Sequence, residues 1–215
     1  MNEVAIIDYG LGNLYSVARA IEQVGGTVRL VDSSAGIDAA QRLILPGVGA
    51  FAAGMAGLQS RNLVDAIRSY ATSGRPLMGI CLGMQMLLEC SHEFGMHEGL
   101  GIIPGSVVQV RPAERADFRA KIPHVGWGAL FPSREGAWQG TAFEQVQGGE
   151  SAYFVHSYMA SPTHAEHRLA DINYGGIDIC AAVGRGAVVG CQFHPEKSGP
   201  TGLKILKNFV ERAGS

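Results

Sequence analysis

The stretch Leu77–Gln85, LMGICLGMQ, places a thiol between two glycines directly after a short apolar run. Residues 77–80 read as a buried strand, and a helix is expected to begin directly after Cys81. Gly79 and Gly83 remove side chains that would collide in so sharp a turn from strand to helix, and the amides of the following helix favour a thiolate. The pattern predicts a nucleophile elbow. The alternative is a buried cysteine that packs as a small apolar residue.

The segments before this stretch alternate between strand and helix patterns. Short apolar runs predict buried strands, and apolar residues at helical spacing predict amphipathic helices between them. The predicted strands are 4–7, 27–31, 42–45 and 77–80, and the predicted helices are 14–24, 51–58 and 63–71. Such alternation is typical of a parallel sheet that is covered by helices on both faces.

From about Pro104 onward the pattern changes to short strand-like runs separated by Gly, Pro and Asn. The runs are 107–110, 153–156, 179–183 and 188–193, and a closing helix is expected after Gly202. They predict antiparallel additions to the same domain. No repeat or linker interrupts the pattern. The expected fold is therefore one α/β domain over residues 1–215, with a mostly parallel central sheet, helices on both faces and antiparallel additions in the C-terminal half.

The composition excludes several classes of function. Lys and Arg total 17 against 19 Asp and Glu, so the formal charge is -2 and no basic stripe is present for nucleic acid. The apolar segments are short and interrupted, and the N-terminus lacks the features of a signal peptide. Four cysteines without a CxxC pair are too sparse for a disulfide scaffold. We expect a soluble cytoplasmic protein with reduced thiols and neither nucleic acid nor membrane as a partner.

A proton-transfer partner for Cys81 is offered by Gln192–Glu196, QFHPE, at the end of the last predicted strand. Because a proline biases the preceding residue toward extended geometry, His194 and Glu196 are expected to project on the same side of the chain. Glu196 then accepts from one imidazole nitrogen while the other faces the thiol, as in a catalytic triad. Taken alone, a strand-end histidine near a surface carboxylate is the simpler interpretation. Its pairing with the elbow favours the triad.

A third element, Leu45–Gly49 with the sequence LPGVG, directly follows another predicted strand. Preorganised backbone donors stabilise tetrahedral oxyanions, and glycines permit the backbone conformations that aim such donors inward. The element is predicted to contribute to an oxyanion hole. A β-turn before a helix is the alternative.

Together and in this order, these elements resemble the triad-type (class I) glutamine amidotransferases, in which Cys, His and Glu release ammonia from glutamine. The resemblance is most specific to the glutaminase subunits of imidazole glycerol phosphate synthase, in histidine biosynthesis, and spans nearly the whole chain. The segments that carry it are IIDYGLGNL, LPGVGAF, GICLGMQMLLE, GLGIIPG, PHVGW, YFVHSY and QFHPEKSG. The elbow and the HPE unit belong to the wider class, whereas the N-terminal loop, PHVGW and YFVHSY are typical of these subunits.

The resemblance implies a catalytic role for each triad position. Cys81 corresponds to the nucleophile, His194 to the acid and base, and Glu196 to the partner that orients the histidine. The oxyanion is expected to face the Leu82 amide and a backbone amide of Gly47–Val48. No metal and no cofactor are implied.

The resemblance also implies a glutamine pocket. The matching positions are Gly49, Gln85, Glu93, Ser157 and Tyr158. Glu93 suits the α-ammonium group by charge, and Gln85 suits the polar groups of the substrate. Without the resemblance, a solvated helix face is the simplest interpretation of these two side chains.

A partner is implied as well, a cyclase subunit built as a (β/α)₈ barrel that receives the ammonia in a heterodimer. The matching contact positions are Asn13, Trp127, Tyr153 and Lys197, although Trp127 could equally be a core residue and Tyr153 an ordinary strand aromatic. The family usually has Asn after GW, where this chain has Gly128, which cannot supply side-chain hydrogen bonds. Partner binding is expected to activate the glutaminase by turning a peptide of residues 47–49 into the oxyanion hole.

Two other motifs are interpreted as having no ligand. GLGNLY has Tyr15 where a dinucleotide-binding loop needs its third glycine, and His164–His167, HAEH, lacks a matching third metal ligand.

Three alternative functions stay open. They are another triad amidotransferase subunit, such as those for pyridoxal phosphate or anthranilate synthesis, a stand-alone cysteine hydrolase with the same triad, and a silent binding module of the same fold.

Overall fold

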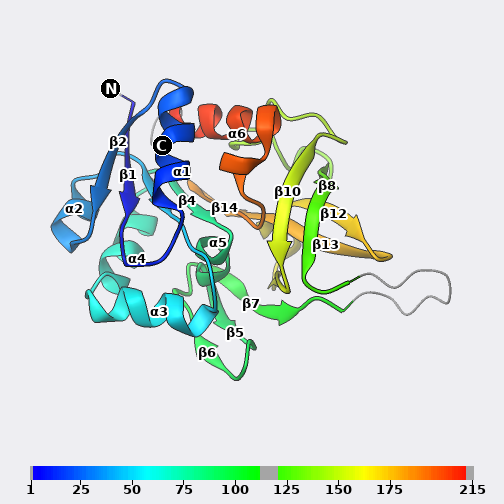
Figure 1. Ribbon diagram of the computed structural model, residues 1–215, viewed down its shortest axis with the longest axis horizontal. Coiled ribbons are helices and arrows are strands. Elements are labelled where there is room, and N and C mark those ends of the chain that lie inside the picture. Colours follow the sequence, from blue (N-terminus) through cyan, green and yellow to red (C-terminus); the bar gives the residue numbers. More distant parts are fainter. Residues whose placement is uncertain (1, 112–120, 212–215) are drawn as a thin grey trace.

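The computed structural model of the chain describes residues 2–111 and 121–211 (Figure 1). The strands are β1 (Glu3–Ile7), β2 (Thr27–Val31), β3 (Leu43–Leu45), β4 (Leu77–Ile80), β5 (Leu88–Ser91), β6 (His97–Glu98), β7 (Ile103–Gln109), β8 (His124–Ala129), β9 (Phe131–Pro132), β10 (Ser151–His156), β11 (Tyr158–Pro162), β12 (Arg168–Tyr174), β13 (Ile177–Arg185) and β14 (Val188–Cys191). The helices are α1 (Leu14–Gln23), α2 (Ser34–Asp38), α3 (Phe51–Ser60), α4 (Val64–Thr72), α5 (Leu82–Met86) and α6 (Gly199–Glu211), with 3₁₀ turns η1 (Ala165–His167) and η2 (Pro195–Lys197).

The central sheet has the strand order β2-β1-β3-β4-β14-β13-β12-β9. Neighbouring strands are parallel from β2 through β14 and antiparallel from β14 to β9. The mostly parallel α/β fold is thereby confirmed. One detail of the prediction was wrong, because the 188–193 run is not a purely antiparallel addition. The chain reverses after β13, so β14 returns in the direction of β4 and pairs with it in parallel.

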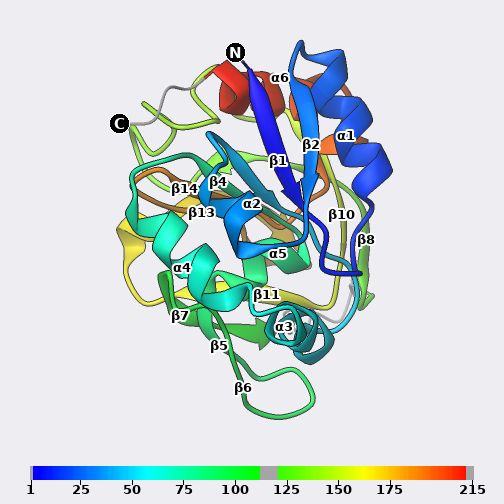
Figure 2. The ribbon, with the colours of Figure 1, turned by 90° about the vertical axis from the view of Figure 1, so that its left-hand side faces the viewer.

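The side chains of β1 point alternately to the two faces of the central sheet, and those on both faces are buried. Val4 and Ile6 join one apolar cluster with Val17 of α1 and Phe209 of α6. Ala5 and Ile7 face the other way and join a second cluster that includes residues of α3, α4 and α5. Helices α1 and α6 therefore cover one face of the sheet and α3, α4 and α5 the other, as the two orientations in Figure 1 and Figure 2 show.

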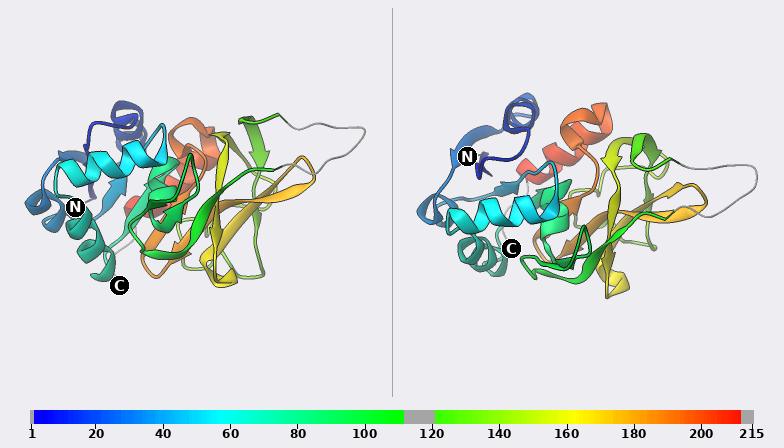
Figure 3. Two further views of the ribbon diagram at one scale, coloured as in Figure 1. Left: turned by 90° about the horizontal axis from the view of Figure 1, so that it is seen from below. Right: turned by 60° about the horizontal axis from the view of Figure 1, so that its bottom comes forward.

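Two smaller sheets lie outside the central one. One has the order β11-β7-β5-β6, and the other pairs β10 with β8 over their full lengths. The predicted runs 107–110 and 153–156 belong to these sheets and not to the central sheet. In Figure 3 the green and yellow strands of this part stand at the end of the molecule opposite the blue N-terminal strands.

The closing helix begins earlier than predicted, at Gly199 and not after Gly202. Pro200 lies in its first turn, where the missing N–H costs nothing because no intrahelical acceptor exists there. None of the helices within residues 2–111 and 121–211 is both long and apolar enough to cross a membrane.

Candidate active site

Cys81 lies where β4 ends and α5 begins, in a conformation that L-residues seldom adopt, with φ 55° and ψ -110°. Such a residue is strained by about 1–3 kcal/mol, and strain of this kind gathers at functional sites. The flanking glycines have the predicted mechanical role. A Cβ on Gly83 would lie 1.8 Å from the Leu45 carbonyl oxygen, and one on Gly79 would lie 2.8 Å from the Gly83 carbonyl group. The elbow can therefore form only with glycine at both positions.

The parallel pairing of β4 with β14 brings the QFHPE segment, which follows β14, close to Cys81. The Cys81 amide donates to the Cys191 carbonyl over 2.7 Å, and the chain leaves β14 directly toward His194. The carboxyl ends of adjacent parallel strands are where α/β proteins commonly bind ligands. His194 Nδ1 lies 2.8 Å from Glu196 Oε1, and these two side chains are 7% and 1% exposed.

The electrostatics of His194 follow from these contacts. Burial alone would lower the pKa of the imidazole, but its hydrogen bonds to Cys81 and Glu196 outweigh burial and raise the pKa to about 9. The backbone of the turn is also fixed, because the His194 amide donates to the Tyr153 carbonyl and the Ser198 hydroxyl donates to the His194 carbonyl. With a pKa of about 9, the imidazole is a cation at neutral pH and lies beside the Cys81 sulfur.

The predicted cause of the His194 and Glu196 contact was wrong, although the contact itself is present. His194 is extended, but Pro195 begins the 3₁₀ turn η2, so the two side chains do not alternate along a strand. Pro195 is fixed in a conformation that suits the first position of such a turn, and the turn carries Glu196 back toward the imidazole.

The LPGVG segment packs directly on the elbow. A Cβ on Gly47 would lie 2.9 Å from Leu82 Cβ, so the two predicted oxyanion-hole segments are in contact. Val48 is 40% exposed, and Gly49 adopts φ +99°, a region that favours glycine. The backbone of this loop therefore lies against Leu82 and Gly83 of the elbow.

Tyr9 supports this loop and was missed in the sequence. Its buried hydroxyl donates to the Pro46 carbonyl over 2.8 Å. Burial, and to a smaller extent the nearby Cys81, raise the pKa of this phenol well above its ordinary value, so it remains a neutral donor. The only signal in the sequence was its place in the loop after the first strand.

The predicted glutamine-pocket residues do not form a solvated helix face. Gln85 is 7% exposed, and its amide nitrogen donates to the Tyr158 carbonyl and to Gln192 Oε1. Glu93 follows β5, and its Oε2 accepts from the Phe51 amide over 2.6 Å at the start of α3.

Ser157 and Tyr158 lie where β10 passes into β11, and the Tyr158 carbonyl is linked to α5 by its bond from Gln85. Ser157 joins β10 to β11, and its carbonyl accepts from the Val110 amide. The Tyr158 ring meets the exposed Phe94 ring edge to face, with 6.3 Å between centroids. Gln192 is fully buried near Cys81 and was also missed, although it lies in the quoted QFHPE motif.

The positions predicted to meet a partner lie on neighbouring elements. Trp127 is 59% exposed, so it is not a core residue, and its ring is 5.8 Å from that of Tyr153, its register partner. Val125 and Val155 pair on the same outer face of β8 and β10 and are also exposed. We call these four side chains the outer face of the β8/β10 sheet.

Asn13 directly precedes α1, and Lys197 lies in η2, which contacts both α1 and β10. The Asn13 side chain accepts from the Ser16 amide and caps α1, so it has a structural role. Lys197 is exposed in η2.

Gly128 faces inward, away from that outer face. A Cβ there would lie 3.1 Å from Ile172 Cδ1 and 3.2 Å from Phe154 Cε2, so a side chain would crowd both. Packing accounts for the glycine at this position.

Within residues 2–111 and 121–211, no group of three or more His, Cys, Asp or Glu side chains is placed to hold a metal ion. His164 and His167 of the HAEH motif meet edge to face at 5.4 Å between ring centroids.

Comparison with known proteins gives concordant results. Residues 5–213 match the family model described as Glutamine amidotransferase class-I. The chain is 49% identical over 213 residues to imidazole glycerol phosphate synthase subunit HisH 1 of Legionella pneumophila (strain Lens), covering 98% of this chain and 100% of that protein. It is 45% identical over 211 residues to the HisH subunit of Moorella thermoacetica, covering 98% and 95%. A solved structure of a glutamine amidotransferase aligns with a TM-score of 0.71 at 18% identity, covering 97% of this chain and 99% of that one, which shows a common fold.

Proposed function

Because the chain belongs to the class-I glutamine amidotransferase family and, within it, to the HisH subunits of imidazole glycerol phosphate synthase, we propose that Cys81, His194 and Glu196 hydrolyse L-glutamine to glutamate and ammonia for histidine biosynthesis. The observation that carries this assignment is the strained Cys81 elbow beside a buried His194 that is bonded to Glu196 over 2.8 Å. These are the nucleophile, the base and the orienting carboxylate of a triad.

The first half of the reaction forms a thioester. With the proton of the Cys81 thiol transferred to His194, the thiolate sulfur attacks the carboxamide carbon of glutamine, and the resulting oxyanion is stabilised by the Leu82 amide and an amide of Gly47–Val48. His194 gives a proton to the leaving nitrogen, and ammonia departs as the carbon–nitrogen bond breaks.

The second half releases glutamate. His194 accepts a proton from water, the hydroxide attacks the γ-glutamyl thioester, and the proton returns to the sulfur as the carbon–sulfur bond breaks. Glu196 holds the imidazole throughout. Gly49, Gln85, Glu93, Ser157 and Tyr158 bind the substrate in this proposal, with Glu93 on its α-ammonium group.

The proposed partner is a cyclase subunit with a (β/α)₈ barrel that receives the ammonia in a heterodimer. The outer face of the β8/β10 sheet supports this, because exposed aromatic and apolar side chains are typical of the centre of an interface. Trp127 and Tyr153 lie on this face, with Asn13 and Lys197 on adjoining elements. The bond from the His194 amide to the Tyr153 carbonyl ties the docking strand to the triad, which supports activation by the partner.

We place the protein in the cytoplasm without nucleic acid or membrane as a partner. All four cysteines lie among the described residues and are free thiols, as a reducing compartment keeps them. The formal charge of -2 suits a small-molecule substrate and a protein partner.

The test is glutamate release from glutamine by the purified chain, alone and with the cyclase subunit and its ribonucleotide substrate. Strong activation by the partner, abolished in Cys81→Ala, is expected. High activity without a partner would favour a stand-alone hydrolase, and no glutamate from an intact complex would favour a silent binding module.

A further inference from the structure

A chain of buried polar groups leads to Cys81 from the side of the β8/β10 sheet. His124 Nδ1 lies 3.2 Å from His156 Nε2, and His156 Nδ1 lies 2.9 Å from the Tyr158 carbonyl oxygen. Gln85 Nε2 donates to the same oxygen over 3.1 Å and to Gln192 Oε1 over 3.0 Å. Gln192 Nε2 reaches Cys81 Sγ over 3.9 Å, within the longer range of sulfur acceptors. All four of these imidazole and amide side chains are buried.

The Tyr158 carbonyl fixes the direction of every bond in this chain. A carbonyl oxygen can only accept, so His156 Nδ1 carries a proton and Gln85 presents its nitrogen. A neutral His156 then has an accepting Nε2, to which His124 Nδ1 donates. Gln85 donates onward to Gln192, which must therefore present its oxygen there. The Gln192 nitrogen is left facing the sulfur, so Cys81 receives a hydrogen-bond donor.

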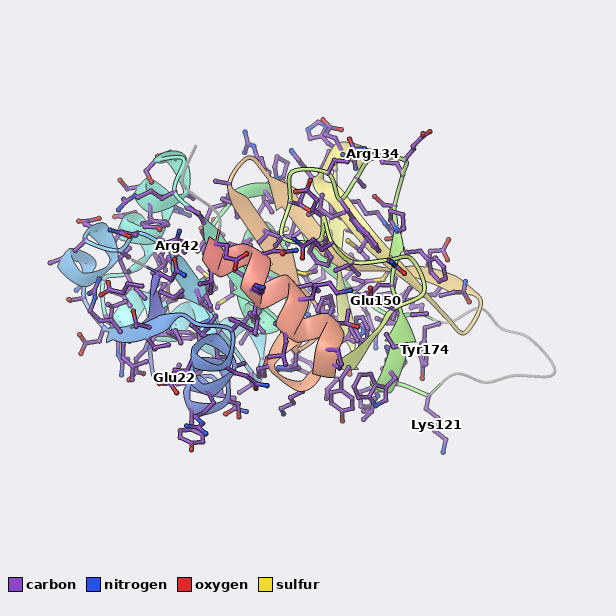
Figure 4. All side chains as sticks on the ribbon, turned by 90° about the horizontal axis from the view of Figure 1, so that it is seen from above. Glu22, Arg42, Lys121, Arg134, Glu150 and Tyr174 are labelled. Carbon is purple, nitrogen blue, oxygen red and sulfur yellow. The ribbon has the colours of Figure 1, made fainter. Side chains whose placement is uncertain are left out.

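The histidine pair is held in place by its surroundings. The His124 ring stacks on Tyr174, with 4.0 Å between centroids, and on Phe154, with 5.3 Å. Tyr174 donates its hydroxyl to the Lys121 carbonyl, and Figure 4 shows these two residues together at the same side of the molecule. Burial lowers the pKa of His124 and lowers that of His156 to about 4, so both rings are neutral near pH 7. Neutral rings are what the bonding pattern requires.

We propose that Gln192 is a positioning residue for Cys81, held as a hydrogen-bond donor to the sulfur by Gln85 and, through the Tyr158 carbonyl, by His156 and His124. This inference rests on the proposed role of Cys81 as nucleophile. The sulfur then has His194 as its proton-transfer partner and the Gln192 amide as a second, fixed contact. An oriented nucleophile reacts faster because less reorganisation is needed in the transition state.

The test measures how fast the thiol is alkylated when the glutamine site is occupied. The full chain with the cyclase subunit is treated with 6-diazo-5-oxo-L-norleucine, a glutamine analogue with an electrophilic carbon. In Gln192→Met, which keeps length and removes the donor, we expect kinact to fall about tenfold or more while KI stays within about twofold. In Gln192→Glu, which keeps the shape and places an acceptor at the sulfur, we expect a larger fall.

The matched control is Asn208→Leu. Asn208 Nδ2 makes a buried bond to the Ala142 carbonyl over 3.0 Å in another part of the molecule. This variant loses a comparable buried amide contact, so it reports any general effect of destabilisation on alkylation. Urea unfolding of every variant checks that each one is folded under the conditions of the alkylation assay. We expect kinact of Asn208→Leu to equal that of the wild type.

Each other outcome overturns the inference. An unchanged kinact in Gln192→Met would show that the amide does not position the sulfur. A loss confined to KI would make Gln192 part of the substrate pocket, and an equal loss in Asn208→Leu would make the effect one of stability. If Cys81 of the wild type is not alkylated at all, the proposed function fails together with the inference.

Discussion

His194 and His156 are both buried, His156 as the last residue of β10 and His194 through its amide bond to the Tyr153 carbonyl of that strand, yet their pKa values move in opposite directions. Burial lowers the pKa of each ring, because a cation is poorly solvated in the interior. At His194 the bonds to Cys81 and Glu196 outweigh burial and raise the pKa to about 9. At His156 the bond to the Tyr158 carbonyl does not outweigh burial, and the pKa falls to about 4. Burial lowers the pKa of both rings, so the difference between their hydrogen-bond partners decides which ring is a cation and which is neutral near pH 7.

The largest difference between the two histidines is expected in the rate of glutamine hydrolysis. His194→Gln removes the proposed acid and base, so kcat should fall by about 10³–10⁴-fold, the upper range for such groups. His156→Gln acts only through Gln85 and Gln192, so kcat should fall by about tenfold. Glutamate release at saturating glutamine measures both. Equal losses in the two variants would contradict the division of roles.

Glu196→Gln tests the cause of the raised pKa of His194. The variant removes the negative charge beside the imidazole, so the pKa of His194 should fall from about 9 toward its ordinary value of 6.5. Because the ring also loses the partner that orients it, kcat should fall by about 10²–10³-fold. Titration of the ring by NMR gives the pKa. A pKa that stays near 9 would show that Cys81 alone maintains the shift.

Acid should destabilise the protein through His156. Its folded pKa of about 4 lies below the ordinary 6.5, so the unfolded chain binds more protons between these values and stability falls as pH decreases from 6.5 to 4. The shift corresponds to about 3 kcal/mol of unfolding free energy. Urea unfolding at pH 7 and pH 4 should show this loss in the wild type and a smaller loss in His156→Gln.

His194 should act in the opposite direction. Its folded pKa is raised, so its contribution to stability is present below pH 6.5 and is lost as pH rises toward 9. Unfolding of His194→Gln over this alkaline range should therefore depend less on pH than that of the wild type. The same dependence in both proteins would contradict a raised folded pKa.

Strands β8 and β10 carry His124 and His156 on one face and Trp127, a proposed contact of the cyclase subunit, on the other. Trp127→Ala should weaken binding of the cyclase subunit by about 2 kcal/mol, the scale of an aromatic residue at the centre of an interface. Calorimetric titration of the complex measures this change. Phe131→Ala is the matched control, because Phe131 is a similarly exposed aromatic on β9. Similar losses in both variants would contradict a specific docking face.

The sequence allowed prediction of features that depend on local pattern. The Cys81 elbow follows from an apolar run with flanking glycines, and the alternation of buried strands and amphipathic helices follows from periodicity. The contact between Gln85 and Gln192 joins residues 107 positions apart, so no local pattern contains it. The bond from Tyr9 to Pro46 also joins residues far apart in the sequence. The parallel direction of β14 likewise cannot be read from a local pattern, because it depends on pairing with the edge of β4 that β3 does not occupy. These features arise from which strands become neighbours.

The smallest expected effect is on the free energy of unfolding and comes from substitution of Gly128. This glycine lies on the inner face of the β8/β10 sheet, the face that also carries His124 and His156. In Gly128→Asn the new Cβ would crowd Ile172 and Phe154, and Phe154 stacks on His124. We expect a loss of about 1 kcal/mol in unfolding free energy, because overpacking outweighs the entropy gained by replacing a glycine. The adjacent Ala129→Asn, on the alternate face of the strand, should stay within about 0.5 kcal/mol. If Gly128→Asn instead stabilises the protein, the inner face has room to repack, and the histidine pair is less rigidly held than the stacking indicates.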